Sequence, residues 1–151
     1  MKNFFFITLF LGSFLNAQSY YKKISEKNIN TERQTISKNF ILDFLKKCED
    51  KNYSKFENYN IAKKFEMFLD EKLESICKKN DEELGKIELL DFDSAHLNKY
   101  SINKDPYELF VFNAKTEKNP DLKYLSVWIY QDRNYISGLV ITKEKPFKSK
   151  K

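Results

Sequence analysis

Apolar side chains recur every three or four positions in two stretches of the chain. They are Ile36, Phe40, Ile41, Phe44, Leu45 and Cys48 in the first, and Ile61, Phe65, Phe68, Leu69, Leu73, Ile76 and Cys77 in the second. This spacing places each set on one face of an α-helix. We therefore expect two amphipathic helices. The first begins at a capping box, Thr31–Gln34, and the second ends before Gly85, which can take the left-handed conformation that closes a helix.

Beyond Gly85 the hydrophobic period changes from about 3.6 to two, which predicts β-strands. The expected strands are residues 87–92, 107–115, 124–131 and 135–143. A long polar connection, 93–106, follows the first strand, and hairpin turns at 116–123 and 132–134 join the others. The predicted fold class is α+β, with two N-terminal helices packed on a curved antiparallel sheet of about four strands.

Both faces of the predicted sheet are apolar. In the third strand Tyr124, Trp128 and Tyr130 alternate with Val127 and Ile129, and in the second strand Leu109 and Val111 alternate with Phe110 and Phe112. Two helices can cover only one face of such a sheet. The other needs a further cover, which could be curvature of the sheet on itself, a subunit partner or a bound ligand.

The first residues of the chain resemble a signal peptide. Lys2 precedes the uninterrupted apolar run Phe4–Leu15, and a small residue, Ala17, stands where signal peptidase cleaves. The run is shorter than the ~20 apolar residues that a transmembrane helix requires. No cysteine stands directly after it, so lipid attachment is not expected. We predict cleavage after Ala17 and an exported product, periplasmic or secreted, with no integral membrane segment.

Removing those 17 residues from 151 leaves 134, a common size for a single domain. We expect a flexible lead-in at 18–30, one α+β domain at 31–143 and a basic tail at 144–151. The chain carries a net charge of +5, but its cations are almost all lysines that alternate with acidic residues. This pattern is typical of a solvated surface, and nucleic acid is not an expected partner.

Cys48 and Cys77 raise the question of a disulfide, because export leads to an oxidising compartment. If the helices form an antiparallel hairpin, Cys77 lies 16 residues beyond Ile61, about 24 Å from the end that carries Cys48. A disulfide needs Cα atoms within about 7 Å. We therefore expect two buried free thiols, with a disulfide as the alternative.

His96 is the only histidine of the chain, and Asp91 and Asp93 precede it closely. These groups could form a general base or a weak metal site. An Asp-rich segment is more typical of a solvated turn, and metal sites need three or four ligands. The chain has no Gly-rich phosphate loop, zinc spacing or Ser-His-Asp constellation. No catalytic residue, metal or cofactor is predicted.

Aromatic residues of the strands are the candidate binding residues. Either a ligand pocket or an interface could use them, although a covered sheet also uses such residues as ordinary core. The set is Tyr107, Phe110, Phe112, Tyr124, Trp128, Tyr130 and Tyr135.

Two helices followed by an antiparallel sheet resemble the NTF2-like superfamily, which has a cystatin-like fold. Short similarities occur at Asn52–Phe56, Leu84–Ile87 and Ile136–Ile141. The resemblance implies a cone of helices and curved sheet around an apolar pocket, with uses from isomerase or dehydratase sites to binding and dimerisation without chemistry. The 93–106 connection is longer than the family pattern.

Three functions follow from these features. The first is a non-catalytic exported binding or interaction domain that takes a small apolar ligand or a protein partner on its sheet, with a homodimer as one form of it. The second is a small pocket enzyme, of isomerase, dehydratase or hydrolase type, which would use His96 with Asp91 or Asp93. The third is an immunity or envelope protein that binds another protein through the sheet.

Overall fold

A computed structural model describes residues 21–98 and 105–145 of the chain. The elements, in chain order, are β1 (Tyr21–Lys23), a 3₁₀ turn η1 (Glu26–Asn28), α1 (Thr31–Glu49), α2 (Lys63–Leu84), β2 (Ile87–Asn98), β3 (Tyr107–Thr116), β4 (Tyr124–Tyr130) and β5 (Ile136–Thr142). The predicted signal peptide, residues 1–17, and the end of the basic tail, residues 146–151, lie outside the described residues.

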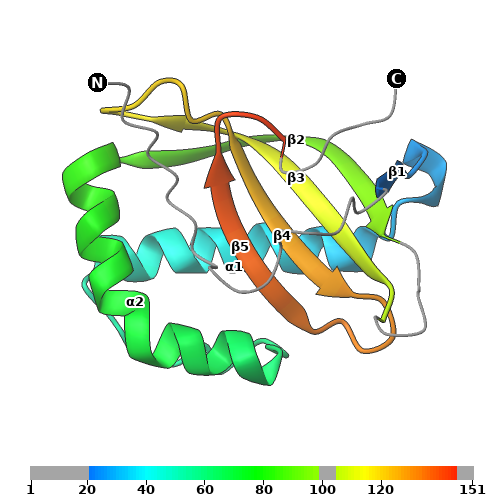
Figure 1. Ribbon diagram of the computed structural model, residues 1–151, viewed down its shortest axis with the longest axis horizontal. Helices are drawn as coiled ribbons and strands as arrows, with labels where there is room; N and C mark the ends of the chain where they lie inside the picture. Colours follow the sequence, from blue (N-terminus) through cyan, green and yellow to red (C-terminus); the bar gives the residue numbers. More distant parts are fainter. Residues whose placement is uncertain (1–20, 99–104, 146–151) are drawn as a thin grey trace.

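The five strands form one antiparallel sheet in the order β1-β2-β3-β4-β5, visible in Figure 1. The α+β class is confirmed, but the sheet has five strands instead of about four. The additional strand, β1, falls in the range that we expected to be a flexible lead-in. β1 has only three residues, which is too short to show a hydrophobic period. It forms because Tyr21 pairs with Asn98, far along the chain.

β2 is twice the predicted length. It continues through Asn98 where a polar connection was expected, so His96 lies in a strand and not in a loop. Two register shifts, between Leu89 and Phe92 and between Phe92 and Ser94, insert extra residues against β3. Such β-bulges interrupt the alternation of polar and apolar positions, which explains why the sequence pattern was lost there.

The helix boundaries agree closely with the expected ones, but the N-cap of α1 differs. Asn30, not Thr31, is the cap, and its side-chain oxygen accepts a hydrogen bond from the Arg33 amide at 2.8 Å. Gly85 ends α2 with a positive φ of 64°, as predicted for a glycine, although its ψ of −144° is not that of a left-handed helix. A Cβ at Gly85 would lie 2.6 Å from Glu117 Oε2, so Glu117 would have to shift, and the positive φ would strain any other residue there.

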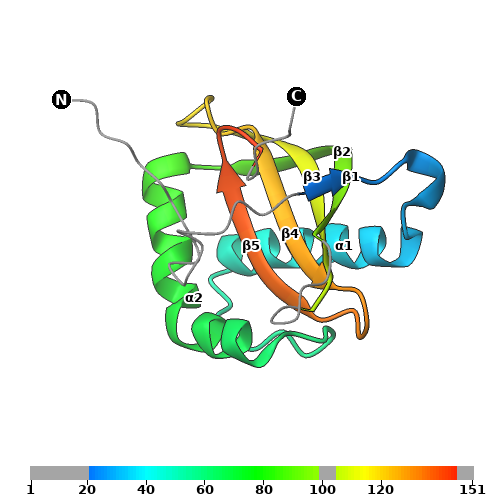
Figure 2. The ribbon, with the colours of Figure 1, turned by 45° about the vertical axis from the view of Figure 1, so that its right-hand side comes forward.

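Both helices pack on the same face of the sheet, which we call the helix-covered face. α1 crosses the strands and α2 lies beyond β5, as Figures 1 and 2 show. The sheet contributes alternate residues to this core, which are Phe110, Phe112, Leu125, Val127, Ile129, Leu139 and Ile141. Phe40 of α1 and Phe65 of α2 are buried against them, with ring centroids 6.2 Å apart.

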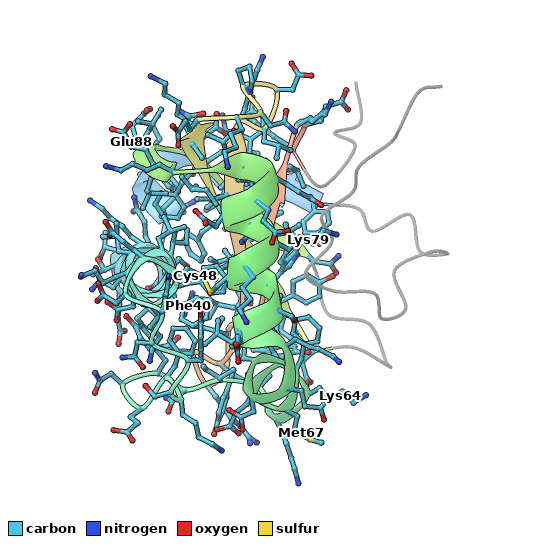
Figure 3. The ribbon with its side chains drawn as sticks, turned by 90° about the vertical axis from the view of Figure 1, so that its left-hand side faces the viewer. Phe40, Cys48, Lys64, Met67, Lys79 and Glu88 are labelled. Atoms are coloured by element: carbon cyan, nitrogen blue, oxygen red, sulfur yellow. A yellow bond between two sulfur atoms is a disulfide. The ribbon has the colours of Figure 1, made fainter. Side chains whose placement is uncertain are left out.

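Cys48 and Cys77 form a disulfide with a Cα–Cα distance of 5.0 Å, and the expectation of free thiols was wrong. Figure 3 shows Cys48 of α1 beside α2. The assumed antiparallel hairpin was the error. The connection after α1 first runs to β5, where the Ala62 amide donates to the Ile136 carbonyl at 2.8 Å, and only then does α2 begin. Because α2 starts beside β5 and not beside Cys48, the length of the helix brings Cys77 to Cys48 instead of carrying it away.

Candidate functional site

The predicted aromatic residues divide between the two faces of the sheet. Phe110 and Phe112 belong to the helix-covered face and are 0% and 1% exposed, so they are core. Register places Tyr107, Tyr124, Trp128 and Tyr130 together on the opposite face. Tyr135 precedes β5 and is half-buried, and its carbonyl accepts from the Tyr130 amide at 2.9 Å. The structure thus brings four of the seven residues together on one strand surface.

We call this second surface the aromatic face and define it by eight residues of β3, β4 and β5. They are Tyr107, Leu109, Val111, Tyr124, Ser126, Trp128, Tyr130 and Val140. Leu109 and Val111 at its centre are buried, whereas Tyr124, Trp128 and Tyr130 are partly exposed. The face combines an aliphatic centre with aromatic rings that solvent reaches.

The Trp128 indole packs beside Gly138, its neighbour on β5, which has no side chain. Gly138 stands opposite it in the register, and a Cβ there would lie 3.3 Å from the indole ring. The indole nitrogen donates to the hydroxyl of Tyr21 on β1 at 3.0 Å. Tyr21 in turn donates to the Tyr107 hydroxyl at 3.4 Å. Burial, together with Tyr107, raises the pKa of Tyr21 well above its usual value, which keeps the hydroxyl protonated.

Two hydroxyls of β4 and β5 face the same side without a partner among the described residues. Ser126 Oγ and Thr142 Oγ1 are both buried and make no hydrogen bond there. Thr142 pairs with Tyr124, and Ser126 lies between Tyr124 and Trp128 in the alternation of β4. A buried hydroxyl without a partner is unfavourable, so these groups would gain from a polar atom supplied by a bound molecule.

His96 and Asp93 meet through Ser94 on the β2 side of the aromatic face. Ser94 donates to an Asp93 carboxylate oxygen, and His96 Nε2 lies 2.9 Å from Ser94 Oγ. Lys145 extends this row of bonded side chains through an ion pair with Asp93 at 2.6 Å. Burial opposes ionisation of Asp93, but hydrogen bonds from Lys145 and Ser94 outweigh it, and the pKa of Asp93 is lowered.

The direction of these hydrogen bonds determines their chemistry. The single Ser94 hydrogen goes to Asp93, so the serine oxygen accepts from His96 Nε2–H. Burial, with repulsion from Lys145 and Lys23, lowers the pKa of His96 to about 4, so its ring is neutral at pH 7. The histidine therefore donates to the serine and does not withdraw its proton, which is the opposite of what a serine nucleophile needs.

Asp91 lies apart from this cluster. It is exposed on the first β2 bulge, where it accepts a hydrogen bond from the Asn113 amide at 3.1 Å. Among residues 21–98 and 105–145, no three histidine, cysteine or acidic side chains gather as a metal site would require. Of the three residues considered for catalysis, His96 and Asp93 both hydrogen-bond to Ser94, whereas Asp91 is a separate carboxylate on the surface.

Sequence reasoning missed one buried ion pair on the helix-covered face. Arg33 of α1 holds Glu108 of β3 through two bonds, at 2.7 Å and 3.1 Å, and Gln131 donates to the same carboxylate at 2.8 Å. The Glu108 side chain is 4% exposed. A glutamate at an inward strand position, between Tyr107 and Leu109, was the available signal. This pair fixes the start of α1 on the sheet.

No described helix combines the length and the hydrophobicity that a membrane crossing demands. No protein-family model, curated protein or solved structure matches this chain. The family resemblance therefore stays a prediction.

Proposed function

We propose that the mature protein is an exported, non-catalytic binding or interaction domain whose contact surface is the aromatic face. One observation carries this proposal: both helices pack on the other side of the sheet, and the aromatic face presents partly exposed rings around a buried apolar centre. Aromatic residues with polar tips are enriched where proteins bind partners or ligands. An NTF2-like architecture, used for binding, would be consistent with this surface.

Export is supported by two independent features. The apolar run Phe4–Leu15 with Ala17 has the layout of a cleaved signal peptide. The Cys48–Cys77 disulfide is of a kind that persists in oxidising compartments. The proposed location is therefore the periplasm or the extracellular medium.

The groups of the aromatic face favour an occupant of mixed character. Trp128, Tyr124 and Tyr130 offer ring surface that is partly exposed, and a tyrosine hydroxyl can accept or donate a hydrogen bond. A small apolar molecule, or an apolar surface of a partner protein, with a single polar group matches this arrangement. The pocket enzyme is less well supported, because neutral His96 donates to Ser94.

Trp128 makes the proposal measurable because it is the only tryptophan of the chain. We suggest titrating the exported protein with the apolar dye anilinonaphthalene sulfonate and following energy transfer from Trp128. Tyr124→Ser and Tyr130→Ser should each weaken binding about five-fold, the effect of losing roughly 1 kcal/mol of ring contact. Met67→Ser is the matched control, since Met67 is 52% exposed on α2.

Two outcomes would contradict the proposal. One is dye binding that weakens in Met67→Ser but not in the two tyrosine variants. The other is a wild-type protein that shows no energy transfer from Trp128 and no dimer in sedimentation. A dimer that dissociates in Tyr130→Ser would instead identify the occupant as a second copy of the chain.

A further inference from the structure

β2 has a free edge over its first half. β1 pairs only with residues from His96 to Asn98, and the Ile24 amide adds one bond to the Ala95 carbonyl. Among the described residues, no strand pairs with the outer edge of residues 87–93. Its backbone amides and carbonyls on that side can bond to another extended chain.

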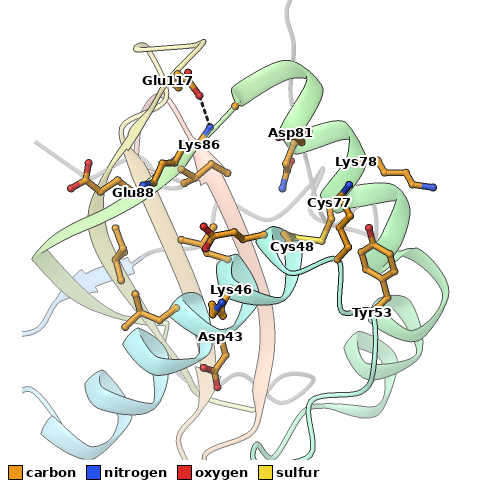
Figure 4. Close-up of a pocket in the computed structure, with 18 residues that line it drawn as sticks. Asp43, Lys46, Cys48, Tyr53, Cys77, Lys78, Asp81, Lys86, Glu88 and Glu117 are labelled. Atoms are coloured by element: carbon orange, nitrogen blue, oxygen red, sulfur yellow. Dashed lines mark hydrogen bonds between the residues drawn. A yellow bond between two sulfur atoms is a disulfide. The ribbon is translucent and has the colours of Figure 1, made fainter.

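A groove of about 850 Å³ runs along this edge, between α1, α2 and β2 (Figure 4). Its apolar walls come from Leu42 and Leu45 of α1, Ile87 and Leu89 of β2, and the Cys48–Cys77 disulfide. Leu42 is 43% exposed, although it lies beside a hydrophobic wall. The disulfide joins α1 to α2 in the wall of the groove, where the two Cα atoms lie 5.0 Å apart.

Asn80 supplies a second, independent sign of a ligand. It lines the groove on α2, close to one turn after Cys77, and is only 5% exposed. Its Oδ1 atom has no hydrogen-bond partner among the described residues. Because a buried carbonyl without a donor is costly, this atom is placed to accept from an N–H group of an occupant.

The charged residues around the groove indicate the sign of the charge that an occupant should carry. Two of its four lysines are already held by acids outside the lining, Lys46 by Asp50 and Lys78 by Glu74, each at 2.6 Å. That leaves Lys51 and Lys86 against five lining carboxylates, which belong to Asp43, Glu49, Asp81, Glu88 and Glu117. The uncompensated charge is negative, so a basic occupant is favoured.

A second copy of the chain is a poor occupant of this edge. Antiparallel pairing of two β2 edges would bring Glu88, Asp91 and Asp93 of one copy toward the same acidic strand of the other. The two bulges also disrupt the ladder that such a pair needs. Both features act against self-association and leave a basic strand from another protein as the fitting partner.

We propose that the groove and the free β2 edge bind an extended, apolar and basic peptide segment of a partner protein, which adds a strand beside residues 87–89. Main-chain hydrogen bonds supply the affinity in this mode, and side-chain pockets supply the selectivity. Alternate apolar side chains contact Leu42 and Leu89, while a lysine or arginine donates to Asn80 Oδ1. This site is separate from the aromatic face.

The test uses a fluorescein-labelled peptide that alternates lysine and valine, Lys-Val-Lys-Val-Lys-Val, in fluorescence anisotropy with the full exported protein. We expect saturable binding below about 1 mM. N-methylation of the peptide amides that face β2 should weaken binding at least ten-fold, because it removes the edge hydrogen bonds without altering the protein. A Glu-Val peptide of the same length should bind at least ten-fold more weakly.

Matched variants locate the site. Glu88→Lys and Leu42→Ser should each weaken binding about five-fold, whereas Glu71→Lys and Met67→Ser, exposed on α2 outside the groove, should not. Absent binding, equal affinity of the N-methylated peptide, or weakening by Tyr130→Ser alone would overturn the proposal. Because Tyr130 belongs only to the aromatic face, the Tyr130→Ser variant distinguishes peptide binding in the groove from binding at the aromatic face. The groove proposal can therefore fail while the proposed function stands.

Discussion

Both faces of the sheet carry apolar residues, but the two faces differ in how far solvent reaches them. The helix-covered face buries Phe110, Phe112 and Val127 completely under α1 and α2. The aromatic face leaves Tyr124 and Trp128 partly exposed, and a hydroxyl, Ser126 Oγ, lies buried at its centre without a described partner. A core residue of the first face serves stability, whereas the second face keeps surface that a partner can cover.

The largest expected contrast is in stability. Phe112→Ala should lower the free energy of unfolding by about 3–5 kcal/mol, because Phe112 is 1% exposed and truncation leaves a cavity. Urea unfolding, followed by circular dichroism, measures this loss. An effect below about 1 kcal/mol would mean that Phe112 is not packed as described.

The disulfide should stabilise the helices that cover the first face. It joins residues 29 positions apart, so its loss should cost about 3–4 kcal/mol through greater freedom of the unfolded chain. The comparison is between the oxidised protein and the Cys48→Ser, Cys77→Ser double variant in urea. Dye binding at the aromatic face should be unchanged in native conditions. Two free thiols per chain in the denatured, unreduced protein would refute the bridge.

Acid should destabilise the β2 side of the aromatic face. The pKa of His96 is about 4 in the fold and about 6.5 when unfolded, so the unfolded state binds the proton first. The contribution of neutral His96 to the free energy of unfolding is fully present above pH 6.5. About 2–3 kcal/mol of it is lost as the pH falls from 6.5 toward 4.

His96→Gln is the control for this pH dependence, because glutamine does not titrate. Its urea midpoint should fall less between pH 7 and pH 4.5 than the wild-type midpoint does. The slope that remains belongs to carboxylates such as Asp93, whose lowered pKa also makes it stabilising only when ionised. Equal pH slopes in wild type and variant would exclude His96 as their source.

The smallest stability effect is expected on the rim of the aromatic face. Tyr130→Ser should lower the free energy of unfolding by about 1 kcal/mol or less, because the ring is already partly exposed. The same urea experiment as for Phe112→Ala measures it. A loss as large as that of Phe112→Ala would show that both faces are core, and the contrast between them would disappear.

Local patterns predicted most of the fold. Periods of 3.6 and two located both helices and the last three strands within about two residues, and the alternation of Tyr124, Trp128 and Tyr130 with Val127 and Ile129 was correct. β1 was missed because a three-residue strand has no period. The end of β2 was missed because bulges beside Asp93 interrupt the alternation.

The site was harder to predict because it depends on contacts between distant parts of the chain. The Trp128–Tyr21 bond joins residues 107 positions apart, and no local pattern indicates it. The disulfide was only the alternative to free thiols because a helix hairpin was assumed, whereas the chain reaches β5 at Ile136 before α2 starts. Alternation within the predicted strand already separated Phe110 and Phe112 from Leu109 and Val111, but the sequence could not show which of the two faces the helices cover.

Native mass spectrometry of the protein recovered from the cells that produce it naturally, or from their medium, tests the central claim most directly. We predict a chain that begins at Gln18 and carries either a bound small molecule or a partner chain, and we predict that Trp128→Ser loses this added mass. A bare monomer in the wild type, with the same spectrum in Trp128→Ser, would contradict a binding role for the aromatic face.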